Sequence, residues 1–131
     1  MLEKEDVKRA MKLKKIGFFK ELDHGLGDGE SLKDNILDRP QAYEDKIINY
    51  LKNGIIYCNS PGLIMDALDE NDKVIGNLNI LTDGEWLWPS DLSYYVEQYH
   101  VKVNEDFVEH MKKSNWTMIN LEEINLVQLE L

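Results

Sequence analysis

Residues 77–100 read NLNILTDGEWLWPSDLSYYVEQYH, and this stretch decides the fold that the sequence predicts. Asp83-Gly84 separates two short apolar runs, and an Asp-Gly pair tolerates the positive φ angles of a two-residue type I′ hairpin. The expected cross-strand pairs are Thr82 with Glu85, Leu81 with Trp86, Ile80 with Leu87 and Asn79 with Trp88. Because side chains alternate between the faces of a strand, both faces of this hairpin carry apolar groups. That pattern is typical of strands that are central in a sheet, or that cover a core with one face and meet a partner with the other.

An amphipathic helix is expected directly after the hairpin. Pro89 has no amide hydrogen to donate to a strand ladder, so it ends the second strand. Ser90 is the expected N-cap, and Asp91 follows in the positively polarised first turn. Residues at spacings of three and four then share one apolar face, namely Leu92, Tyr95, Val96 and Tyr99.

The remaining segments predict further helices and one strand. Charged residues 3–14 favour a short helix, and a second short helix begins where the Ser31 hydroxyl accepts from the Asp34 amide. Residues 41–53 form the clearest early helix, with Tyr43, Ile47, Tyr50 and Leu51 on one face and Gly54 as its stop. Residues 55–58 are β-prone, Ser60-Pro61-Gly62 is expected to turn the chain, and Asn104 caps a helix with Phe107, Val108 and Met111 directed inward.

These elements predict an α+β fold, in which a small antiparallel sheet with a central Asp-Gly hairpin packs against several amphipathic helices. The 131 residues suffice for one hydrophobic core, so residues 1–131 are expected to form a single domain. Within it we expect a charged N-terminal helix over 1–15, a core over 16–120, and a terminal strand or helix over 121–131.

Composition indicates a folded, cytoplasmic protein. Hydrophobic residues make up 43% of the chain and charged residues 31%. No apolar run approaches the roughly 20 residues that cross a bilayer, and Met1 is followed by charged residues, so neither a membrane partner nor a signal segment is expected. Cys58 is the only cysteine, which rules out an intrachain disulfide, and a small buried side chain is its expected role.

The net charge of −10 is unevenly distributed along the chain. Residues 1–20 carry a balance of +4, and the remaining residues carry −14. An acidic body repels a phosphate backbone, so nucleic acid is not an expected partner. A basic protein is attracted to it instead. The alternative is that the charge only keeps the protein soluble.

The same sequence resembles a family of small, mostly uncharacterised bacterial cytoplasmic proteins. Its blocks are Gly17-Phe18-Phe19, Glu21-Leu22, Ser31-Leu32, Tyr50-Leu51, Gly54, Ser60-Pro61-Gly62, Asp66 to Asp69, Thr82-Asp83-Gly84, Trp86, Trp88-Pro89, Asp91-Leu92 and Tyr94-Tyr95-Val96. The resemblance extends over residues 16–116 and is most specific in the tryptophan block. It implies one bacterial domain, and, by analogy with other small acidic bacterial proteins, an immunity partner of a secreted toxin.

No catalytic, cofactor-binding or metal-binding residue set is predicted. The glycines at 25, 27 and 29 lack dinucleotide or P-loop spacing, and a calcium loop starting at Asp66 would place Asn71 and Asn77 where glycine and glutamate are required. His24, His100 and His110 lack zinc-site spacing, and no nucleophile elbow is present. A small cytoplasmic enzyme of unknown reaction, with a histidine meeting carboxylates in a closed pocket, remains the alternative function.

The favoured hypothesis is a non-enzymatic, acidic protein-binding module, an immunity or antitoxin type of inhibitor of a basic toxin or nuclease. The densest acidic segment and the tryptophan hairpin supply the predicted contact residues, which are Asp66, Asp69, Glu70, Asp72, Glu85 and Trp86. Core packing is the competing role for Trp86 and Trp88, because burial is the commoner use of an aromatic side chain.

Overall fold

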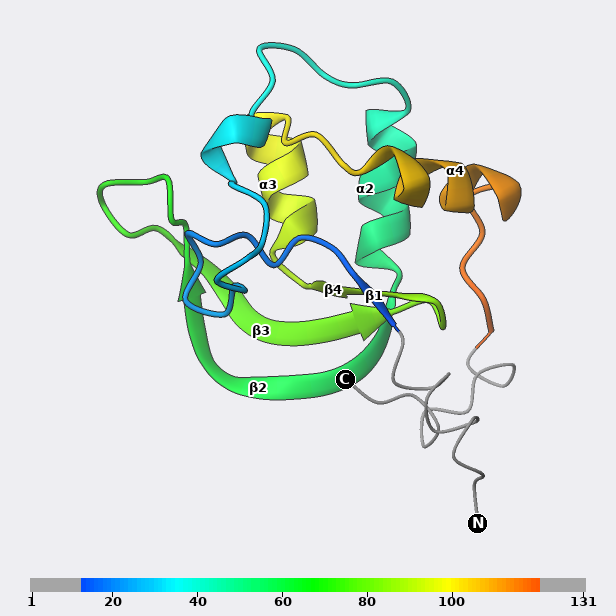
Figure 1. The fold of residues 1–131 in the computed structure, drawn as a ribbon. Helices are drawn as coiled ribbons and strands as arrows, with labels where there is room; N and C mark the ends of the chain where they lie inside the picture. Colours follow the sequence, from blue (N-terminus) through cyan, green and yellow to red (C-terminus); the bar gives the residue numbers. More distant parts are fainter. Residues whose placement is uncertain (1–12, 121–131) are drawn as a thin grey trace.

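A four-stranded sheet with three helices on one side forms the fold, as Figure 1 shows for residues 13–120, the part of the chain that the computed structural model describes. The elements in chain order are β1 (Lys14–Lys15), the 3-10 helix η1 (Lys33–Asn35), α2 (Glu44–Lys52), β2 (Ile55–Met65), β3 (Val74–Thr82), β4 (Trp86–Pro89), α3 (Leu92–Tyr99) and α4 (Glu105–Lys113). The α+β class is confirmed.

The sheet is mixed, whereas the sequence predicted an antiparallel one. Its strand order is β1-β4-β3-β2, with β1 parallel to β4 and the other neighbours antiparallel. Lys14-Lys15 forms β1 and not the end of the expected N-terminal helix, because its backbone joins β4: the Lys14 amide donates to the Glu85 carbonyl at 3.0 Å. Residues 1–12 of that expected helix, and the expected terminal strand or helix over 121–131, lie outside the described residues.

The β3–β4 turn is longer than the two-residue hairpin that Asp83-Gly84 predicted. Thr82 pairs with Leu87, Leu81 with Trp88 and Ile80 with Pro89, so the register is displaced by two residues. Only Gly84 has a positive φ, of 98°, whereas a type I′ turn requires one at Asp83 as well. A displacement of two residues leaves every side chain on its expected face, because side chains alternate between the faces of a strand with a period of two residues.

The central position of β4 follows from its apolar composition. All four of its residues are buried between β1 and β3, which confirms the prediction of a central strand. Trp86 and Trp88 are 6% and 0% exposed, and their ring centres lie 4.9 and 5.4 Å from the ring centre of Phe107. Core packing is therefore the observed role of both tryptophans.

β2 continues through Ser60-Pro61-Gly62, where the sequence predicted a turn. The strand pair with β3 is irregular there, since the register shifts between Ser60 and Leu63. Gly62 adopts a φ of 108°, and Pro61 is tolerated because β2 is an edge strand that needs fewer backbone donors. Cys58, on this edge strand, is exposed and not buried as expected.

Helix starts follow local side-chain chemistry, with two corrections. The Asn104 side chain accepts from the Asp106 amide at 2.8 Å and caps α4, and the Ser31 hydroxyl accepts from the Asp34 amide at 3.3 Å, both as expected. α2 begins at Glu44 and not at residue 41 as expected, because the backbone of Tyr43 is in the left-handed conformation. The Tyr43 side chain is exposed and does not join the apolar face of the helix. α3 is preceded by Asp91 as its N-cap, since the Ser90 hydroxyl instead accepts from the Asn79 amide of β3.

Candidate partner-binding groove

A groove lies between residues 21–24 and the end of β2, where β2 and β3 project beyond the rest of the sheet. Its volume is about 520 Å³. It is lined by Glu21, Leu22, Asp23, His24, Pro61, Gly62, Leu63, Ile64, Met65, Asp66, Ala67, Asp72 and Leu78. We name this site the acidic groove, because four of its lining residues are carboxylates.

Glu21 shapes one wall of the acidic groove. Its carboxylate accepts from the Ser31 hydroxyl at 2.9 Å, the Leu32 amide at 2.8 Å and the Lys33 amide at 2.9 Å, and so holds the start of η1. Burial alone would raise the pKa of Glu21, but these three hydrogen bonds outweigh it and lower the pKa to about 2. The Glu21 side chain is therefore negatively charged at every physiological pH.

Asp66 anchors the opposite wall. It is 1% exposed, and its Oδ2 atom accepts from the hydroxyls of Tyr94 at 2.7 Å and Tyr99 at 2.6 Å, while Oδ1 accepts from the Leu68 amide at 2.8 Å. Burial opposes the charge of Asp66, yet the hydrogen bonds from Tyr99, Tyr94 and the amide lower its pKa. Tyr95 of α3 also holds this segment, because its hydroxyl accepts from the Ala67 amide at 2.9 Å.

His24 links the groove wall to a buried carboxylate of α3. Its Nε2 atom lies 2.8 Å from Oδ2 of Asp91, whose side chain is 0% exposed. The two atoms are in close contact without the geometry of a hydrogen bond, an ion pair only when the imidazole is protonated, and neither has another hydrogen-bond partner among the described residues. This contact holds residues 21–24 against the helical layer.

The remaining groove residues offer free charge beside apolar surface. The Asp23 and Asp72 side chains are exposed, and residues 13–120 provide neither of them with a hydrogen bond or an ion pair. Leu63 and Met65 on β2 are 62% and 50% exposed, so they add accessible apolar surface beside these charges. The acidic groove can therefore take a segment that carries both positive charge and an apolar side chain.

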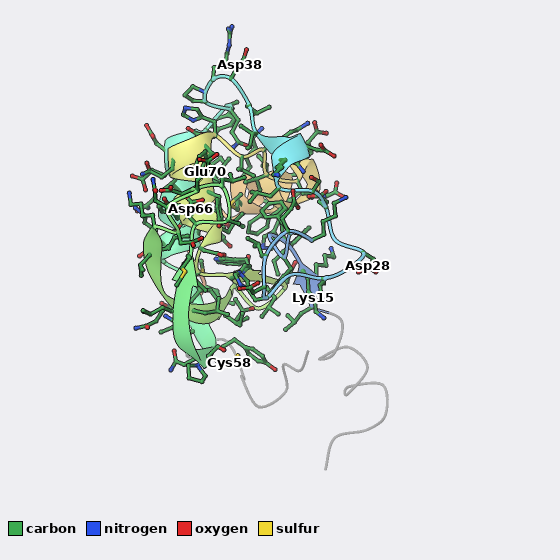
Figure 2. The ribbon with its side chains drawn as sticks, turned by 90° about the vertical axis from the view of Figure 1, so that its left-hand side faces the viewer. Lys15, Asp28, Asp38, Cys58, Asp66 and Glu70 are labelled. Atoms are coloured by element: carbon green, nitrogen blue, oxygen red, sulfur yellow. The ribbon has the colours of Figure 1, made fainter. Side chains whose placement is uncertain are left out.

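The structure divides the six predicted contact residues between two places. Figure 2 shows Asp66 and Glu70 close together, beyond the end of β2 that is distant from Cys58. Asp72 lies on the same loop and lines the groove, while Asp69 is half-buried and its Oδ1 accepts from the Asn71 amide at 2.9 Å.

Glu85 and Trp86 lie at the other end of β3, which spans Val74–Thr82 and is therefore about 25–30 Å long. The six residues do not form one surface. Asp66 and Trp86 are in addition buried, so neither side chain offers an exposed surface to a protein partner. Among the predicted residues, only Asp69, Glu70 and Asp72 present an accessible acidic edge near the groove.

Sequence reasoning missed Glu21, Asp23 and His24. The glycine-rich segment after Asp23 is folded back on residues 18–19: the Leu26 amide donates to the Phe18 carbonyl at 3.1 Å. A Cβ atom on Gly25 would lie 1.8 Å from the Phe19 carbonyl oxygen, so glycine is required there. The clustered glycines were the available signal for a tightly packed loop.

Each of the three histidines meets a carboxylate, although no sequence spacing predicted it. Besides His24, Nδ1 of His100 lies 2.9 Å from Glu44, and Nε2 of His110 lies 2.8 Å from Asp83. No group of three or more histidine, cysteine and acidic side chains suited to a metal ion occurs within residues 13–120. The three pairs are at separate places in the fold, and the small-enzyme alternative stays a prediction.

No family model matches this chain, and neither the curated proteins nor the solved structures include a significant match to it. The resemblance to a bacterial family therefore remains a prediction. Among the described residues, no helix has the length and apolar character needed to span a bilayer.

Proposed function

We propose that this protein is a non-enzymatic binding module for a basic protein, of the immunity or antitoxin type, and that the acidic groove is its binding site. The observation that carries the proposal is the combination, in one groove, of four carboxylates with exposed Leu63 and Met65. A bacterial origin and a cytoplasmic location, where such an inhibitor would meet its toxin, belong to the same proposal.

The charges of the groove support a basic partner. The lowered pKa values of Glu21 and Asp66 mean that both side chains are charged at neutral pH, although both are committed to hydrogen bonds within the protein. Asp23 and Asp72 are not committed in this way, so they are available for lysine or arginine. The net charge of −10 adds long-range attraction, which raises the association rate.

The apolar side chains of the groove supply the affinity that charge alone does not. Exposed ion pairs contribute little free energy, about 0–1 kcal/mol each. Burying Leu63 and Met65 under a partner removes apolar surface from water, which stabilises a complex by about 25 cal/mol per Å² before the cost of association. An inhibitor of this type blocks its target by occupancy and needs no catalytic residues.

The test compares two double charge-reversal variants of the full chain. D23K/D72K changes the groove, and D38K/D45K makes the same change in charge at exposed positions that do not line it. A basic partner captured by the wild-type protein is then studied by stopped-flow association at several salt concentrations. We expect the groove variant to associate at least 10-fold more slowly and with a flatter salt dependence. The association rate of the control variant should fall much less. Equal effects of the two variants, or a partner that is not basic, would contradict the proposal.

A further inference from the structure

A second groove lies at the other end of β3, between β1, the β3–β4 turn and α4. Its volume is about 650 Å³, and its lining residues include Lys14, Glu85, Trp86, His110 and Lys113. None of its lining residues lines the acidic groove, so what it does is independent of the proposed function. We name it the His110 groove.

Asp83 fixes the orientation of His110. The Asp83 side chain is 1% exposed, and its Oδ1 atom accepts from the amides of Glu85 at 3.0 Å and Trp86 at 2.8 Å. Oδ2 accepts from the Tyr50 hydroxyl at 2.6 Å and lies 2.8 Å from Nε2 of His110. Because this oxygen is an acceptor, Nε2 carries a hydrogen. The other ring nitrogen, Nδ1, carries a hydrogen as well only in the imidazolium form, and in that form it can donate to a carboxylate.

Nδ1 of His110 is occupied only by an exposed side chain. It lies 3.3 Å from Oε2 of Glu85, whose side chain is 67% exposed. Residues 13–120 provide the Glu85 carboxylate with no other partner, so little holds it in place. A carboxylate from a ligand can make the same contact at Nδ1 when the Glu85 side chain swings into solvent.

Two further side chains with hydrogen-bond donors, Trp86 and Lys14, line the same groove. Trp86 is 6% exposed, and its Nε1 atom is buried without a hydrogen-bond partner in the described part of the chain, which is costly for a buried donor. Trp88, two residues later, differs because its Nε1 donates to the Leu51 carbonyl at 3.2 Å. Lys14 Nζ lies 5.3 Å from the centre of the Trp86 ring, and the His110 ring centre lies 6.3 Å from it.

We propose that the His110 groove binds a small organic carboxylate. Its oxygens replace the Glu85 carboxylate at Nδ1 of the His110 imidazolium and accept from Trp86 Nε1, while Lys14 supplies a second positive charge. Asp106 and Glu109 also line the groove and repel a doubly charged anion more strongly than a singly charged one. A monocarboxylate is therefore favoured over phosphate.

The test titrates acetate into the full-length, ¹⁵N-labelled protein at constant ionic strength, with chloride and inorganic phosphate as comparison anions. Acetate should shift the indole N–H signal of Trp86 and the imidazole signals of His110 saturably. The Trp88 indole, already hydrogen-bonded, is the internal control and should not move. A response to chloride or phosphate that equals the response to acetate would overturn the proposal.

Two variants separate this site from a structural role of His110. Glu85→Ala removes the competing carboxylate, so the affinity for acetate should rise at least 3-fold, a gain that a merely structural contact would not produce. His110→Gln keeps a donor in the place of Nε2, toward Asp83, but has no nitrogen in the place of Nδ1, and should abolish the saturable shift. If H110Q does not fold, E85A decides alone, and an unchanged or weaker affinity in E85A refutes the site.

Discussion

Asp66 accepts a 2.6 Å hydrogen bond from the hydroxyl of Tyr99, a residue 33 positions later in the chain. This bond joins the loop between β2 and β3 to the end of α3, the helix that covers the sheet. Because Asp66 also lines the acidic groove, one buried carboxylate holds together both the tertiary structure and the wall of the candidate site. An acidic residue in a charged segment can thus be structural and not a contact residue.

Replacing Asp66 should destabilise the fold more than replacing its acidic neighbours. Asp66→Asn cannot accept from the two tyrosine hydroxyls and from the Leu68 amide together, because an NH2 group replaces one of the two oxygens, and we expect the free energy of unfolding to fall by about 2 kcal/mol in urea denaturation at pH 7. Glu70→Gln is the matched control, because Glu70 is exposed, and it should change stability by less than about 0.5 kcal/mol. Equal losses in the two variants would show that the tyrosine hydrogen bonds contribute little.

The stability of the protein should depend on Glu21 in acid. The hydrogen bonds at Glu21 lower its pKa from the ordinary 4.5 to about 2 in the folded protein, so the unfolded chain binds a proton first as the pH falls. The stabilisation is fully present above pH 4.5 and is lost as the pH falls toward 2. We therefore expect urea denaturation at pH 7, 4 and 3 to show that the difference in the free energy of unfolding between wild type and Glu21→Gln becomes smaller as the pH falls.

The control for this experiment is Asp28→Asn, which changes an exposed carboxylate of the neighbouring loop for which residues 13–120 provide no hydrogen bond or ion pair. Its difference from wild type should stay small at all three pH values. A difference between E21Q and wild type that stays constant from pH 7 to pH 3 would mean that the three hydrogen bonds do not lower the pKa of Glu21.

Cys58 should react in the native state. Its exposure on edge strand β2 predicts that a thiol reagent such as dithionitrobenzoate modifies one thiol per chain without denaturant, and at a rate within about 10-fold of that of the unfolded protein. Cys58→Ser should be close to wild type in stability, because an exposed side chain contributes little packing. Protection of the thiol until urea unfolds the chain would indicate that the side chain is covered.

The parts of the fold that local chemistry determines were predictable. Asn104 caps α4, and the Ser31 hydroxyl accepts from the Asp34 amide of η1, because each bond needs only an oxygen two or three residues before a free amide. The predicted β3–β4 register was wrong because two side chains compete with the type I′ turn: the Thr82 hydroxyl accepts from the Gly84 amide, and the Asp83 carboxylate accepts from two later amides. The Asp-Gly pair alone does not reveal that competition.

The site was less predictable, because it is built from segments that are distant in the sequence. Residues 21–24 meet residues 61–66 across about 40 intervening positions, and no sequence pattern encodes that contact. The structure places the acidic residues of 66–72 in the loop between β2 and β3, and composition does not distinguish buried Asp66 from exposed Asp72. Cys58 was expected inside because cysteine is commonly buried, and its place on an edge strand overrides that tendency.

The packing of Trp88 against Gly54 gives the sharpest stability prediction. Gly54 follows α2 just before β2, and a Cβ atom there would lie 2.6 Å from the Trp88 ring and 2.9 Å from Cβ of Leu81. Trp88 is 0% exposed and its Nε1 donates to the Leu51 carbonyl, so the ring cannot move aside without loss. Gly54→Ala should lower the free energy of unfolding by about 1–3 kcal/mol.

Gly27→Ala makes the same chemical change where a Cβ atom meets no atom within 4 Å. That variant should be neutral or slightly stabilising, because alanine has less conformational entropy than glycine in the unfolded chain. Urea denaturation of both variants, followed by tryptophan fluorescence, separates overpacking from a general effect of replacing glycine. If G54A is as stable as G27A, the contact between the end of α2 and the central strand is looser than the structure indicates, and β4 can adjust to an added methyl group.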